Sequence, residues 1–166
     1  MRSQSSTTKL YTVEDVIIEL KKHGNKKNRE GMARFGINVE KAFGMNVPIM
    51  RKLAKQIGKN HQLAIDLWES GWHEARHVAS MIADPKLVTR SLMNKWVKDF
   101  NSWDICDGTC SNLFCRTPFA YNKVFEWAKR KEEFVRRTAF SLIAYLAVHD
   151  KKRDDKEFLP FLPLIK

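Results

Sequence analysis

The sequence has few features that would support a β-sheet, a disulfide framework or a membrane span. No alternating run of β-branched residues is bounded by tight hairpin dipeptides, which argues against a sheet. No apolar run approaches the roughly 18 residues of a membrane-spanning helix, and residues 1–8 lack the apolar centre of a secretory signal. The three cysteines, an odd number, all lie within residues 106–115. We therefore expect a cytoplasmic protein in a reducing compartment, with no membrane association.

Basic residues are abundant, by contrast. The chain carries 30 Lys and Arg residues against 19 Asp and Glu residues, a formal net charge of +11. Its 166 residues, 43% of them hydrophobic, suffice for one domain with a core. The charge favours a polyanionic partner, with nucleic acid the first candidate and an acidic membrane surface the second. A basic protein without such a ligand is the alternative, because net charge bears on solubility and association rather than fold.

Helical signals recur along the whole chain. Thr12 and Ser102 are placed to cap helices, and Pro48 stands where proline is tolerated in a first turn. Gly58 and Gly71 follow apolar stripes with helical spacing and mark helix ends. The predicted helices cover residues 13–22, 27–35, 48–57, 61–69, 73–83, 86–100, 103–116, 119–129 and 132–149, and a tenth begins near residue 154.

This succession of short helices and short loops predicts an all-α fold in which paired helices stack as a curved solenoid. No exact sequence repeat is visible, so a compact helical bundle is the alternative, and the loop lengths do not separate the two. We expect residues 1–10 to be a flexible N-terminal segment and residues 11–166 to form a single domain. The apolar residues 158–165 end without the polar cap that closes a repeat array, so we expect further helices to follow.

The densest functional pattern is W-D-I-C-D at residues 103–107. In a helix, Trp103 and Asp107 lie on one face, one turn apart, so that an indole and a carboxylate are presented together. The alternative is a capping Asp beside a core Trp, which suits Asp104 in the first turn better than Asp107. The face of Trp103 and Asp107 is rotated by about 100° from the residues that we expect to be buried, Ile105, Cys106, Cys110 and Leu113.

A second pattern places Arg136 and Arg137 within an otherwise apolar predicted helix. At least one of them must lie near the apolar boundary, where a guanidinium usually pairs with a carboxylate or a phosphate. A surface position, or an ordinary partner on a neighbouring helix, is the alternative for either residue.

Together these patterns resemble those of the AlkD-type DNA alkylation repair family, a group of HEAT-like repeat DNA glycosylases. The resemblance covers nearly all of the chain from about Met32 onward, and W-D-x-x-D followed by R-x-A is its most specific part. The segments that match are residues 32–37, 51–55, 67–68, 74–76, 103–107 and 136–139.

The resemblance implies hydrolysis of the N-glycosidic bond of N3- or N7-alkylated purines in double-stranded DNA, by a monomer that needs no metal or other cofactor. It assigns Asp107 as the catalytic carboxylate, which would stabilise the oxocarbenium-like sugar and position water. It places Trp103 against the cationic base or sugar and Arg137 on a backbone phosphate. Phe35 stands where the family pattern has Tyr, and a second active-site Trp of the family lies beyond Lys166.

A groove lined by basic side chains would track the DNA phosphates, and such contacts give affinity without sequence specificity. A non-catalytic repeat module that binds DNA or protein through the same face is the rival interpretation. The residues that we expect to bind DNA are Arg34, Phe35, Arg51, Lys52, Arg76, Lys95 and Arg136.

Two further patterns have metal-binding alternatives that we do not favour. The segment from His73 to His77 matches the H-E-x-x-H motif, in which two imidazoles share a helix face and the Glu acts as base. The charged Arg76 within it, and the lack of a following Gly-x-x-His, favour two partly exposed histidines on a helix. The cysteines lack the C-x-x-C spacing of a metal knuckle, so we expect small core residues at Cys106 and Cys110.

Overall fold

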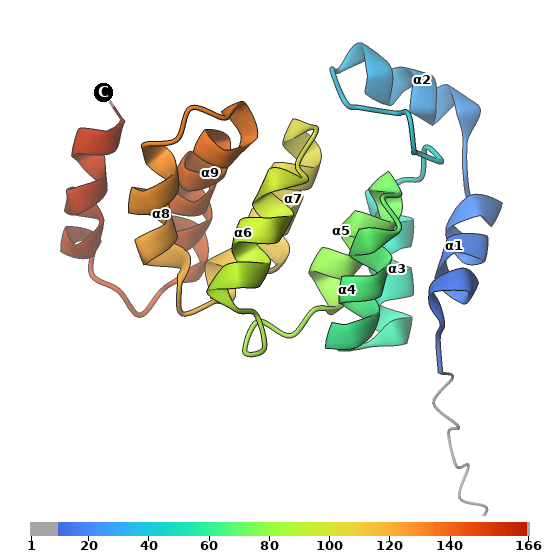
Figure 1. Ribbon diagram of the computed structural model, residues 1–166, viewed down its shortest axis with the longest axis horizontal. Helices are drawn as coiled ribbons and strands as arrows, with labels where there is room; N and C mark the ends of the chain where they lie inside the picture. The colour runs from blue at the N-terminus through green and yellow to red at the C-terminus, as the bar shows by residue number, and fades with distance from the viewer. Residues whose placement is uncertain (1–9, 166) are drawn as a thin grey trace, which may run out of the picture.

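A computed structural model describes residues 10–165 of the chain as helices joined by short loops (Figure 1). Residues 1–9, which make up most of the segment expected to be flexible, lie outside the described residues. The elements are α1 (Val13–Lys22), α2 (Lys26–Arg34), α3 (Val47–Ile57), α4 (His61–Glu69), α5 (His73–Ile82), α6 (Arg90–Lys98), α7 (Trp103–Asn112), the 3₁₀ helix η1 (Phe114–Arg116), α8 (Ala120–Ala128), α9 (Glu133–His149) and the 3₁₀ helix η2 (Asp155–Leu164).

Local capping sets several helix starts. Thr12 and Asp15 form a capping box on α1, in which the Asp15 amide donates to Thr12 Oγ1 over 3.1 Å and the Thr12 amide donates to Asp15 Oδ2 over 3.0 Å. Asn60 and Thr89 accept from the third residue of α4 and of α6 in the same way. Gly58 ends α3 with a φ of 74°, a conformation that glycine adopts without strain.

Two predicted boundaries and one predicted cap were wrong. The helix predicted from residue 86 begins at Arg90, because Thr89 provides the cap and the residues after Pro85 form a turn. The helix predicted over 103–116 divides into α7 and η1. Ser102 takes the N-cap position of α7 without capping it, since its hydroxyl donates to Asp104 Oδ1 over 2.8 Å instead. The last helix, η2, begins at Asp155, as predicted, and it is a 3₁₀ helix that contains Pro160.

The helices stack in two layers, which confirms the predicted solenoid (Figure 1). The first layer consists of α3, α5, α7 and α9, and the second of α4, α6 and α8. In the second layer, the Trp68 ring of α4 stacks on the Trp96 ring of α6 with centroids 4.0 Å apart, and Lys123 of α8 donates to Asn94 of α6 over 2.6 Å. Each helix thus buries its apolar face against its neighbours, as repeat arrays do.

Helix α2 is the exception, because it has no buried residue and lies outside the two layers at the N-terminal end of the array (Figure 1). The loop that follows it is fastened to α5 by Glu74, whose fully buried carboxylate accepts from the amides of Phe43, Gly44 and Met45 at 2.7–3.2 Å. Gly44 has a φ of 81°, and a Cβ there would lie 2.2 Å from the Asn25 carbonyl oxygen. Glu74 and Gly44 together set the path of this loop.

We predict that Glu74→Gln lowers the free energy of unfolding by about 3 kcal/mol, because a single amide oxygen cannot replace a carboxylate that accepts from several buried amides. Urea denaturation followed by circular dichroism measures this change. Glu69→Gln on α4 is the matched control, since Glu69 is exposed and pairs only with Lys95 at the surface. Equal denaturation midpoints for the two variants would contradict the role given to Glu74.

Candidate active site and nucleic-acid interface

The Asp107 carboxylate is held by two residues of α9. Arg137 donates to it through Nε and Nη2 over 3.0 and 2.6 Å, and Ser141 donates to Oδ1 over 2.5 Å. Arg137 and Ser141 lie one turn apart on α9, so both reach the same carboxylate. The Asp107 side chain is 23% exposed. The arrangement orients a carboxylate that is still reachable from solvent.

Trp103 lies one turn before Asp107, on the same side of α7. Ile105 and Thr109 are buried on the opposite side of this helix. Trp103 and Asp107 therefore face away from α4, α6 and α8, on the side of the first layer that we call the open face. Tyr145 of α9 borders this site, and burial, followed by the negative charge of Asp107, raises the pKa of its phenol.

An apolar hollow lies between α2 and α7. The Trp103 indole is 41% exposed, and its Nε1 donates over 3.0 Å to the carbonyl oxygen of Phe35, whose ring is 75% exposed. A hollow with exposed aromatic rings offers stacking surface to a flat ligand such as a nucleobase. Its volume is about 460 Å³, and it is lined by Asn28, Gly31, Met32, Phe35, Ile37, Met45, Asn46 and Trp103.

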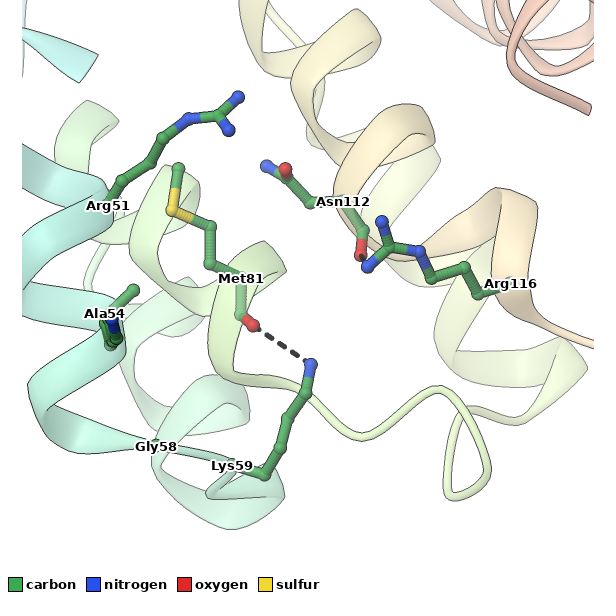
Figure 2. Close-up of a pocket in the computed structure, with 8 residues that line it drawn as sticks. Arg51, Ala54, Gly58, Lys59, Met81, Asn112 and Arg116 are labelled. Carbon is green, nitrogen blue, oxygen red and sulfur yellow. Dashed lines mark hydrogen bonds between the residues drawn. The ribbon is translucent and has the colours of Figure 1, made fainter. Parts of the chain in front are cut away.

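A basic pocket lies between α3, α5 and α7, near the C-terminal ends of these helices (Figure 2). Arg51 and Asn112 point towards each other across Met81, and Arg116 lies beside Asn112 and donates to its carbonyl oxygen. Lys59 donates to the carbonyls of Met81 and Ala83, and burial, followed by the charge of Arg116, lowers its pKa. The pocket has a volume of about 480 Å³ and no acidic residue in its lining, which is Arg51, Ala54, Lys55, Gly58, Lys59, Met81, Asn112 and Arg116.

The other basic residues expected to bind DNA are scattered. Arg34 is exposed on α2 beside Phe35, and Arg136 is exposed on α9. Lys52 lines a different hollow, against Glu19 and His23 of α1. The guanidinium of Arg76 donates to the Asp99 carbonyl over 3.0 Å and lies over the Trp68 ring, and Lys95 pairs with Glu69 on the second layer. The structure brings only Arg51 of this group into the basic pocket.

Sequence reasoning missed several residues of the basic pocket and of the surroundings of Asp107. Lys55 lies one turn after Arg51, a spacing that pointed to a shared helix face. No spacing signal marked the others, because their positions depend on how separate helices pack. These residues are Lys59, Arg116, Ser141 and Tyr145.

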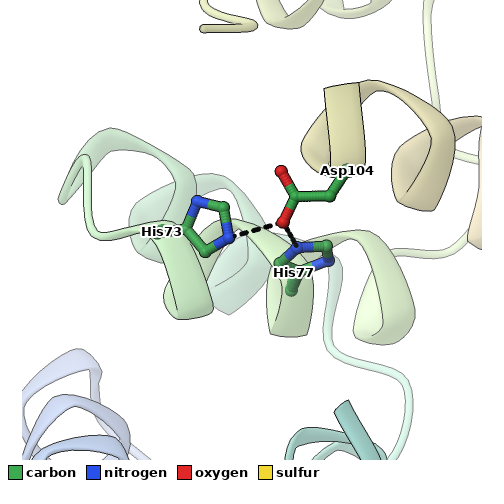
Figure 3. Close-up of side chains that lie close together, drawn as sticks. All are labelled: His73, His77 and Asp104. Carbon is green, nitrogen blue, oxygen red and sulfur yellow. Dashed lines mark hydrogen bonds and ion pairs between the residues drawn. The ribbon is translucent and has the colours of Figure 1, made fainter. Parts of the chain in front are cut away.

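His73 and His77 are buried, at 6% exposure each, and are not the partly exposed pair that the sequence suggested. Both Nε2 atoms point at one oxygen of Asp104, at 2.8 and 3.3 Å (Figure 3). Burial opposes ionisation of Asp104, but hydrogen bonds from the two imidazoles outweigh it and lower the pKa of the carboxyl. Glu74 bonds to the loop between α2 and α3 and is not available as a base beside the histidines. Within the described residues, this trio is the cluster that can hold a metal ion.

The cysteines are buried, which confirms them as core residues. Cys106 and Cys110 are fully covered, and the Cys106 sulfur lies 3.2 Å from the hydroxyl of Thr138 on α9. All three thiols are free, and none belongs to the histidine cluster.

Comparison with known proteins agrees with this fold. The family model described as "DNA alkylation repair enzyme" matches residues 16–162. The chain belongs to this family of DNA alkylation repair enzymes, as the resemblance of its W-D-x-x-D and R-x-A segments indicated. No curated protein matches it.

A solved structure comes from work described as "a new family of proteins related to the HEAT-like repeat DNA glycosylases with affinity for branched DNA structures". It superposes with a TM-score of 0.83 at 22% sequence identity, which establishes the HEAT-like repeat fold. The match covers 93% of this chain and 66% of the other, so this chain spans less than two thirds of that protein's length. No helix among residues 10–165 is long and apolar enough to cross a membrane.

We predict that Trp103→Phe speeds amide hydrogen exchange in α2 by about fivefold, the factor for a hydrogen bond of about 1 kcal/mol. The variant keeps an aromatic ring but loses the Nε1 donor that holds the Phe35 carbonyl. Phe35→Leu is the matched control, since it keeps the backbone acceptor. Unchanged exchange in Trp103→Phe would show that α2 is held by other contacts.

Proposed function

We propose that this chain binds duplex DNA on its open face and hydrolyses the N-glycosidic bond of positively charged N3- or N7-alkylated purines. The observation that carries the proposal is the side-by-side placement of Asp107 and Trp103 on the open face, in the same layer as the basic pocket. A carboxylate beside an indole suits a reaction that passes through a cation.

The proposed chemistry begins with an alkylated base that is already a good leaving group. As the glycosidic bond breaks, its electron pair moves to the base and cancels the positive charge there. The sugar develops oxocarbenium character, which the Asp107 carboxylate stabilises, and water then adds to the anomeric carbon and loses a proton. The exposed face of Trp103 stacks against the cationic base or sugar.

Arg137 has a positioning role in this proposal. Its Nε and Nη2 are taken up by Asp107, and this pairing raises its own pKa. The Nη1 side of the guanidinium is left to meet a backbone phosphate, the contact expected from the sequence. One side chain then fixes the carboxylate relative to the DNA strand.

The basic pocket supplies the phosphate contacts. Arg51, Lys55, Lys59 and Arg116 surround one hollow without a neutralising carboxylate in its lining. Such a group binds the DNA backbone irrespective of sequence and releases counterions when it does so. Steep salt dependence is the expected signature.

A non-catalytic DNA-binding module is the second candidate, and a specific observation favours it. Asp107 already accepts three hydrogen bonds from Arg137 and Ser141, as a carboxylate with a purely structural role does. The structural relative is described by its affinity for branched DNA. On this reading the open face binds DNA and releases no base.

Base release from a duplex containing 7-methylguanine separates the two candidates. We predict that Asp107→Asn reduces the release rate by about 100-fold or more, because the group that stabilises developing positive charge is lost. Asp66→Asn, at an exposed position of α4, is the control and should keep the parental rate. No release by the parent, with retained binding, would leave the module as the function.

The charge-removing double variant Lys55→Ala/Arg116→Ala tests the basic pocket. We predict a slope of log affinity against log salt concentration that is smaller by about 2, one for each phosphate contact removed. Lys98→Ala/Lys129→Ala removes equal charge from exposed positions of α6 and the end of α8, in the second layer, and should leave the slope unchanged. Fluorescence anisotropy of a labelled duplex over a salt series measures both. Equal slopes for the two double variants would place the DNA elsewhere.

A further inference from the structure

We propose that His73, His77 and Asp104 form a binding site for one divalent transition-metal ion, with Zn²⁺ as the ion that the ligands suit best. Two imidazoles from α5 and one carboxylate from α7 converge on a common point (Figure 3). Two nitrogens and one carboxylate oxygen match the ligand preference of zinc. The site does not depend on the proposed function, since it uses neither Asp107 nor the basic pocket.

The spacing of the ligand atoms fits a metal centre. The three candidate atoms all lie within 4.8 Å of one another, and the Asp104 oxygen lies 2.8 and 3.3 Å from the two nitrogens. Ligands bound at about 2.0 Å in a tetrahedron are separated by about 3.3 Å. Small side-chain movements therefore suffice to admit the ion, and a water molecule would complete the four ligands.

The surroundings hold the ligands in place. The other oxygen of Asp104 accepts from the buried Ser102 hydroxyl over 2.8 Å, which leaves Oδ2 directed at the histidines. His77 packs directly against Gly108 of α7, where an added Cβ would lie 3.0 Å from the ring atoms Cε1 and Nδ1. Polar partners that orient a ligand, and close packing behind it, are typical of metal centres.

The charge balance is favourable for a cation. One ionised carboxylate faces two imidazoles, and when the ion binds, each imidazole offers its Nε2 lone pair and carries its proton on Nδ1. Arg76, next to His77 in the sequence, is directed away, since its guanidinium donates to the Trp68 and Asp99 carbonyls. Its guanidinium is held by these carbonyls, although Arg76 lines the same hollow as His73.

The ion would act as a structural clamp and not as a hydrolytic centre. Glu74, the residue that serves as base in H-E-x-x-H enzymes, bonds to the amides of residues 43–45. The site joins α5 to the first turn of α7, the helix that carries Trp103 and Asp107. Zinc binding would thereby fix the position of that helix.

The test uses the full chain, freed of metal by chelator and then titrated with Zn²⁺ alone. We expect saturable binding of one equivalent by calorimetry and a higher Tm in the zinc-loaded form. His73→Gln and His77→Gln should each weaken zinc binding by at least about 100-fold, since each removes one of three ligands. His61→Gln on α4 is the control and should bind zinc as the parent does.

Cobalt substitution identifies the ligands independently of stability. Co²⁺ at this site should show visible ligand-field bands without the intense near-ultraviolet band of a thiolate ligand, which distinguishes the histidine cluster from the cysteines. The assignment would be overturned if Co²⁺ gave a thiolate band and Cys106→Ser abolished that band. It would also be overturned if the parent showed no saturable zinc binding, or if His73→Gln and His77→Gln bound zinc as tightly as His61→Gln. In those cases the trio is a hydrogen-bonded bridge only.

Discussion

The attachment of α7 to the helices on either side of it is the constraint on which the rest of the site depends. Towards α5, Asp104 accepts from two imidazoles and Asn112 donates to Ser80. Towards α9, Asp107 accepts from Arg137 and Ser141. Polar groups on both flanks leave α7 little freedom to rotate about its axis, because rotation would break these hydrogen bonds. The indole and the carboxylate on its open side are directed by these bonds.

The local part of this architecture was predictable from the sequence. The bounds of α1 and α4 match the prediction because caps and helix ends are set by neighbouring residues. The shared face of Trp103 and Asp107 followed from helical periodicity alone. The start of α6 was misplaced, since the turn after Pro85 and the Thr89 cap were not recognised.

The non-local part was not predictable. The partners of Asp107 and Asp104 lie 34 and 31 residues away along the chain, at Ser141 and His73. No periodicity relates such positions, because their contact depends on how helix pairs stack. For the same reason, the sequence suggests a helix-terminal charge at Asp104 and a partly exposed pair at the histidines of α5. Arg76 and Lys95 were expected on the DNA face because their charge, and not their packing, was visible in the sequence.

The absence of buried residues in α2 has a consequence for how the hollow beside Trp103 can change. The helix contributes nothing to the core, yet its C-terminal end supplies the Phe35 ring to the hollow beside Trp103. Substitutions there alter the shape and chemistry of that hollow at little cost to the stability of the repeat array. The hollow can therefore change separately from the scaffold, and α2 is the segment to exchange between relatives when a hollow of different shape is sought.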